Sequence, residues 1–272
     1  MIFKEEDDGG RVMVTTAIGV LGATTNSPYF VVDGLDHPVH VVYDVPHLLK
    51  SVRNNFIRYN IKIDGCVASW EHVDKFYQLD KASPVRLAPR LTDRHIEVSN
   101  VLKMRVCLAA QVLSHSLAAG LRTRVLTNEL NAEVLHTAAF VEKMDNLFDL
   151  LNSRRKRADK PARCAIAKES TNLKLLASFR EWVAKWEFTG ARVQSTIKCH
   201  QGLQISLQSI YALSCELMND GFIFVCTSRF NQDCLENVFA AIRSKQGWNE
   251  NPTPAQFHAA FRSAIILSLI HI

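Results

Sequence analysis

Strand-like segments are confined to the first part of the chain, and nearly everything after them has the spacing of helices. Short strands are predicted at residues 12–14, 30–32 and 39–43, where valine and aromatic residues concentrate. After residue 65 the main strand candidate is Phe222-Ile223-Phe224-Val225. Strands followed by helices predict an α+β or α/β core that is interrupted or followed by an all-helical unit.

Helical periodicity begins directly after the third predicted strand. Pro46 suits the first turn of a helix, and apolar residues then recur at helical spacing as far as Tyr59. Thr92 and Asp93 are predicted to cap a helix that continues to Gly120. The other predicted helices cover residues 70–77, 131–151, 170–188, 202–218, 231–245 and 254–266.

The composition indicates a folded, soluble protein that is not secreted. Of the 272 residues, 47% are hydrophobic and 22% are charged, which is typical of a globular chain. The acidic start Glu5–Asp8 does not resemble a signal peptide, and the apolar run 264–272 is too short to cross a bilayer. Seven cysteines without a CxxC pair predict reduced, buried thiols and no zinc site.

The common phosphate-binding motifs are missing from the sequence. It contains neither a GxxxxGK[ST] loop nor a GxGxxG turn, so known motifs alone do not predict nucleotide binding. The net charge of +5 favours a polyanion only weakly. The basic segment Ser153–Pro161 fits phosphate contact and a solvated connection between helices equally well.

Two segments carry carboxylates that could bind a metal ion. Asp44 follows a predicted strand and precedes a helix that carries Lys50 and Arg53, which suits a divalent cation beside a phosphate backbone. From the residues alone, a simple N-cap of that helix is the favoured interpretation of Asp44. Asp233 and Glu236 are three residues apart, so on a helix they share one face, where a carboxylate could bind a metal ion. The alternative is that they are acidic residues of the first turn, stabilised by the helix dipole.

Four ordered segments closely resemble the P-element transposase family, including its THAP-type relatives. They are DVPHLLKSVRNNF, KMRVCLAAQVLSHSLAAGL, FVEKMDNLFDLLNSR and RFNQDCLENVFAAIRSKQGWNENPTPAQFHAAFR, and the likeness extends from about Val12 to Arg262. The resemblance implies an α/β ribonuclease-H-like core interrupted by a large, mainly α-helical insertion domain that binds GTP. It divides the chain into core residues 1–65, an insertion over 66–228 and a return to the core over 229–272.

The resemblance also assigns candidate site residues. Asp44 and Glu236 correspond to catalytic carboxylates that bind Mg²⁺, and Lys50, Arg53 and Arg243 are candidate nucleic-acid contacts. GTP contacts are expected from seven residues: Arg90, Arg105, Val106, Phe148, Asp149, Asn152 and Asp233. The chemistry fits this assignment. An aromatic ring can stack on the base, a carboxylate can accept from the two N–H donors of guanine, and guanidinium groups can bind phosphates.

The family also implies partners and a cellular location. The expected partner is transposon-end DNA, and GTP helps members of the family to bind this DNA without being hydrolysed. The family also implies homo-oligomerisation and a location in the nucleus rather than in a membrane. The family's first catalytic aspartate has no counterpart in the 272 residues, so we expect this polypeptide alone neither to cleave nor to join DNA. The alternative is a non-catalytic, guanine-nucleotide-binding module that interacts with proteins.

Overall fold

A computed structural model describes residues 2–3, 24–34, 37–191, 193, 196–245, 247 and 251–270. The chain forms two compact units, Met1–Phe230 and Asn231–Ile272. The predicted strand at residues 12–14 lies outside the described residues. The three-part division predicted from the sequence stays a prediction.

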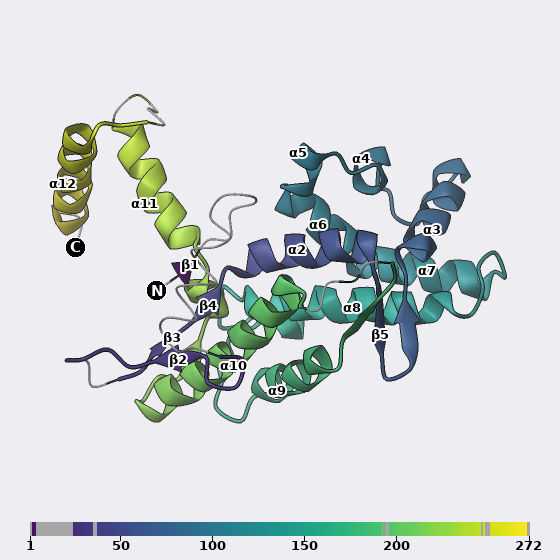
Figure 1. The fold of residues 1–272 in the computed structure, drawn as a ribbon, viewed down its shortest axis with the longest axis horizontal. Helices are drawn as coiled ribbons and strands as arrows, with labels where there is room; N and C mark the ends of the chain where they lie inside the picture. The colour runs from purple at the N-terminus through teal and green to yellow at the C-terminus, as the bar shows by residue number, and fades with distance from the viewer. Residues whose placement is uncertain are drawn as a thin grey trace. The chain divides into compact units, whose positions relative to one another are not determined.

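Four short strands form the N-terminal part of the first unit. Strand β1 (Ile2–Phe3) pairs in parallel with β4 (Val42–Tyr43), and β2 (Tyr29–Phe30) pairs antiparallel with β3 (Val39–His40). The predicted run 39–43 is therefore divided at Val41, which is buried and accepts a hydrogen bond from Ser209 Oγ through its carbonyl. Strand β4 leads directly into helix α2 (Val45–Arg58), as Figure 1 shows.

Helix α2 lies at the centre of the main core. Its predicted apolar stripe is confirmed, because Leu48, Leu49, Val52 and Phe56 are all buried in one cluster. Helices α3 (Trp70–Ala82), α8 (Val134–Leu151) and α10 (Lys198–Asn219) contact it, and α9 (Thr171–Ala184) packs against α8 and α10. In Figure 1, α9 and α10 lie side by side, and these two helices are in contact.

A small antiparallel sheet was not expected from the sequence. Strands β5 (Asn60–Ile63) and β6 (Cys66–Ala68) form a hairpin, and β8 (Glu187–Thr189) adds to the free side of β5. The hairpin turn is Asp64-Gly65, with φ of 49° and 84°, which suits a primed turn between twisted strands. The helix predicted over 170–188 is therefore wrong at its end, where the chain is extended.

The single helix predicted over residues 93–120 is also wrong. Four helices occupy this region: α4 (Asp93–Ile96), α5 (Asn100–Lys103), α6 (Val106–Val112) and α7 (His115–Leu126). Ser99 and Ser114 each cap a new helix, because their hydroxyl groups accept hydrogen bonds from Leu102 N and Leu117 N. Capping serines inside the apolar pattern start new helices there.

The remaining elements complete both units. Strands β7 (Ile166–Ala167) and β9 (Phe224–Val225) pair antiparallel, which confirms the second half of the late strand candidate. Pro161–Arg163 and Thr227–Phe230 form 3-10 helices. The second unit contains helices α11 (Asp233–Ser244) and α12 (Pro254–Ile270), close to the predicted bounds. None of the described helices is long and apolar enough to cross a membrane.

The described cysteines are only partly as predicted. Six of them are free thiols, as expected for Cys66, Cys107, Cys164, Cys199, Cys215 and Cys226. Only Cys199 of these six is buried, whereas Cys66 and Cys107 are exposed. The prediction that the thiols are buried was therefore wrong for Cys66 and Cys107.

Candidate functional site

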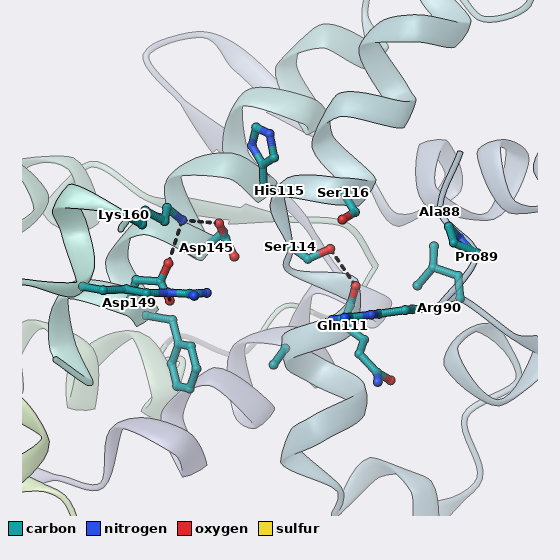
Figure 2. A pocket seen from close by; sticks show the side chains of 14 residues that line it. Ala88, Pro89, Arg90, Gln111, Ser114, His115, Ser116, Asp145, Asp149 and Lys160 are labelled. Atoms are coloured by element: carbon teal, nitrogen blue, oxygen red, sulfur yellow. Dashed lines mark hydrogen bonds and ion pairs between the residues drawn. The ribbon is translucent and has the colours of Figure 1, made fainter. Parts of the chain in front are cut away.

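A cavity of about 720 Å³ opens between helix α8 and the loops that face it. Its lining residues come from the segment before α4, from the junction of α6 with α7, from α8 and from the loop after α8. They are Ala88, Pro89, Arg90, Leu91, Ala110, Gln111, Ser114, His115, Ser116, Asp145, Phe148, Asp149, Lys160 and Arg163. Figure 2 shows Arg90 and Lys160 approaching the cavity from opposite sides.

Ion pairs organise the wall formed by α8. Lys160 Nζ lies 2.5 Å from Asp145 Oδ2 and 2.7 Å from Asp149 Oδ2, and Arg163 Nε lies 3.0 Å from Asp149 Oδ1. Burial alone would lower the pKa of Lys160, but hydrogen bonds to Asp145 and Asp149 outweigh it and raise the pKa. Lys160 is therefore a stable cation beside a mostly buried carboxylate.

The opposite wall is a loop held by one buried carboxylate. Asp80, which is 0% exposed, accepts hydrogen bonds from Leu87 N at 2.7 Å and from Ala88 N at 3.3 Å. Arg86 Nε donates to Asp80 at 3.2 Å, and Arg86 Nη2 donates to Leu91 O at 2.8 Å. These contacts hold the backbone of the loop that carries Arg90 in one conformation.

A second cavity of about 510 Å³ lies beside the first. The two share Phe148, Asp149, Lys160 and Arg163, so the ion pairs of Asp149 stand where the cavities meet. The basic loop after α8 supplies most of the remaining lining residues, which are Asn152, Arg154, Arg155, Arg157, Ala158 and Asp159. Most of the basic loop faces solvent, as one of its two sequence interpretations expects.

The structure brings several predicted nucleotide contacts together. Arg90, Phe148 and Asp149 line the larger cavity, and Asn152 lines the adjoining one. Arg105 and Val106, at the start of α6, are not among the residues that line either of these two cavities. Asp233 belongs to the second unit, at the start of α11.

Sequence reasoning missed the cations that accompany Asp149. Asp145 and Asp149 are four residues apart on α8, so two like charges occupy one helical face and repel each other unless a cation lies nearby. That spacing was a usable signal. The identity of the cation, Lys160, depends on how the loop after α8 folds back, and no local pattern encodes it.

Asp44 caps helix α2, as one of its two interpretations predicted. Its carboxylate is 5% exposed, accepts a hydrogen bond from His47 N at 3.1 Å and lies 2.5 Å from His47 Nδ1. Glu236 is exposed in the first turn of α11 in the second unit. Within the described ranges, no three His, Cys, Asp or Glu side chains gather closely enough to hold a metal ion.

Two of the candidate nucleic-acid contacts are buried in the first unit. Lys50 is 4% exposed and Arg53 is 0% exposed. Arg53 Nη2 donates to the carbonyl of Lys103 at 3.2 Å, and burial lowers its pKa. Contact with DNA would require both side chains to leave these positions, whereas Arg243, in the last turn of α11, is partly exposed.

Comparison with known proteins places this geometry in a family context. The family described as "TNP-like, GTP-binding insertion domain" matches residues 46–164, and the one described as "TNP-like, RNase H C-terminal domain" matches residues 228–262. The first match includes Arg90, Phe148, Asp149 and Lys160, and the second includes Glu236.

Relatives with known names agree with these matches. "Transposable element P transposase" of Drosophila melanogaster is 26% identical over 251 residues, which are 90% of this chain and 33% of that protein. The chain therefore spans about a third of that relative's length. The solved "Drosophila P element transposase strand transfer complex" is similar with a TM-score of 0.80 and 25% identity, over 93% of this chain and 57% of that one. The chain is therefore a P element transposase-like protein with a TNP-like GTP-binding insertion domain and a TNP-like RNase H C-terminal domain.

Proposed function

We propose that this chain binds GTP in the cavity between α8 and the Arg90 loop. The observation that supports this most directly is that Arg90, Phe148 and Asp149 line one cavity inside the segment that resembles a GTP-binding insertion domain. A volume of about 720 Å³ lies in the range of small-molecule sites. The cavity also combines a cation, an aromatic ring and a carboxylate.

Each of these side chains has a role that its chemistry supplies. Phe148 offers an apolar face for the base, and Asp149 accepts from the two donor groups on the edge of guanine. Arg90 binds phosphate oxygens, since a guanidinium group presents paired donors to them. Asp149 retains acceptor capacity beside Lys160 and Arg163, because a carboxylate has about four lone-pair sites.

Titration of the chain with GTP, followed by thermal unfolding, tests this proposal. Binding to the folded state raises the midpoint of unfolding as GTP increases. Asp149→Asn keeps the size of the side chain but places a donor against guanine, so we expect its GTP affinity to fall roughly tenfold or more. Asp64→Asn, in the β5–β6 turn, is a matched control. Equal responses of Asp149→Asn and the wild type would refute the site.

We also propose that the chain contributes to a DNA-engaging, ribonuclease-H-like core that the helical insertion interrupts. Support comes from the likeness to the strand transfer complex and from the two separate family matches. Retention of a transposon-end duplex in a gel at moderate salt would favour this function over the protein-interaction alternative. Retention that is lost steeply with salt, whatever the DNA sequence, would indicate only phosphate contact.

Asp44 and Glu236 remain our proposed magnesium ligands in such a core. Carboxylate oxygens are the donors that Mg²⁺ takes, although Asp44 is engaged by His47 here. Asparagine also serves as an N-cap, so if Asp44 acts only as a cap, Asp44→Asn and the wild type should have the same unfolding free energy, both with and without Mg²⁺. A ligand role predicts that stabilisation by millimolar Mg²⁺, measured by urea unfolding, is lost in this variant but kept in Asp74→Asn.

A further inference from the structure

A lysine held between two carboxylates lies at the end of the cavity that we assign to the base. Asp145 and Asp149 lie one helical turn apart on α8, and Lys160 Nζ contacts both, at 2.5 Å and 2.7 Å. Figure 2 shows the lysine reaching over this pair. The Lys160 side chain is 30% exposed, so its ammonium group is fixed by its partners and still accessible from the cavity.

The ammonium group has one donor more than these contacts use. A lysine ammonium carries three N–H donors, of which Asp145 accepts one and the ion pair with Asp149 can engage at most a second. In the part of the chain that the structure describes, no further acceptor contacts Lys160. Because Lys160 lines both cavities, this third donor is available to an acceptor on a bound molecule.

We propose that Lys160 donates a hydrogen bond to O6 of guanine and makes the site specific for 6-oxopurine nucleotides. This inference rests on the proposed GTP site and adds a specificity residue to it. Lys160 and Asp149 place a donor next to an acceptor, which complements the O6 acceptor and the N1–H and N2–H donors of guanine. Adenine carries an amino group at position 6 and no hydrogen on N1, so both side chains would lose their partners.

A second role for Lys160 would produce a different pattern of specificity. Lys160 could act only through Asp149, by orienting the carboxylate that reads N1–H and N2–H. Hypoxanthine separates the two roles, because it has O6 and N1–H but lacks the 2-amino group. Loss of an O6 contact weakens GTP and ITP equally, whereas misplacement of Asp149 weakens GTP more than ITP.

Titration calorimetry of the full 272-residue chain with GTP, ITP and ATP tests the inference. For Lys160→Met we expect GTP and ITP to lose affinity by the same factor, roughly tenfold to a hundredfold, and ATP to be unchanged. Lys156→Met is the matched control, because this neighbouring lysine is exposed on the same loop and is expected to leave all three affinities unchanged. Thermal unfolding without nucleotide establishes that each variant is folded.

The wild-type chain provides a test that does not depend on a variant. 6-Thio-GTP replaces O6 with sulfur, a weaker acceptor, so we expect it to bind more weakly than GTP. Equal affinity for both, or a GTP-to-ITP ratio that changes in Lys160→Met, would overturn the role of Lys160. A wild-type chain that fails to bind GTP would instead refute the proposed function itself.

Discussion

At the scale of single residues, the location of a charged side chain, in the core or at a cavity wall, distinguishes structural residues from those available to a ligand. Arg53 and Asp80 are both fully buried, and their partners are backbone groups and side chains of the same unit. Asp149 and Lys160 also pair with each other, but they do so at a cavity wall. A buried charge must be paired wherever it lies, so the pairing alone does not identify a site.

His200 gives a pH-dependent prediction at the same scale. Its ring stacks on Trp186 and its Nε2 donates to the carbonyl of Val183 at 2.7 Å. Burial lowers the pKa of His200, and the hydrogen bond to Val183 opposes this only in part. The unfolded chain therefore takes up a proton first as the pH falls below about 6.5, which destabilises the folded state down to the lower pKa of the native chain.

Urea unfolding between pH 7.5 and pH 5 measures this effect. We expect His200→Gln to lose less unfolding free energy than the wild type over that interval, because glutamine does not titrate. His72, whose pKa burial also lowers, remains in both proteins and cancels in the comparison. Parallel pH profiles for the two proteins would contradict the assignment.

At the scale of elements, apolar periodicity predicted the long helices that bury one face in the core. It missed helix boundaries set by capping residues and the hairpin set by a turn. The apolar stripes of α2 and α8 identified both helices, because each buries one face along its length. The four short helices between residues 93 and 126 share a single apolar pattern, and Ser99 and Ser114 divide it. Asp64-Gly65 was a hairpin signal of the standard kind and could have been used.

The candidate site was predictable to a similar extent. The family resemblance supplied Arg90, Phe148 and Asp149, and the structure places them on one cavity. Lys160 lay within the basic segment that the sequence singled out, but its partners did not follow from the sequence. They depend on a loop that returns to α8, which is a tertiary contact between residues 145–149 and 160.

Asp80 provides a prediction for the Arg90 loop. Asp80→Asn removes a buried charge from Arg86 and Arg124 and weakens the hydrogen bonds to the loop backbone. Breaking one partner of a buried ion pair typically costs about 3 kcal/mol, so we expect a loss of that order in urea unfolding. Asp74→Asn on the same helix should change the unfolding free energy by less than about 0.5 kcal/mol. Similar small effects in both variants would mean that the Asp80 network contributes little.

At the scale of the whole molecule, the two units match different families. The first unit contains the complete match to a GTP-binding insertion domain. The match to an RNase H C-terminal domain begins at the last residues of the first unit and ends at residue 262 in the second. All of the residues that line the proposed nucleotide cavity belong to the first unit. GTP binding can therefore be examined apart from any chemistry on DNA.

A crystal structure of the chain grown with GTP tests the central claim most directly. We predict electron density for the base against Phe148, with the carboxylate of Asp149 facing N1 and N2 and the phosphates toward Arg90. Density for GTP only on the exposed basic loop, or at a surface remote from α8, would contradict the account.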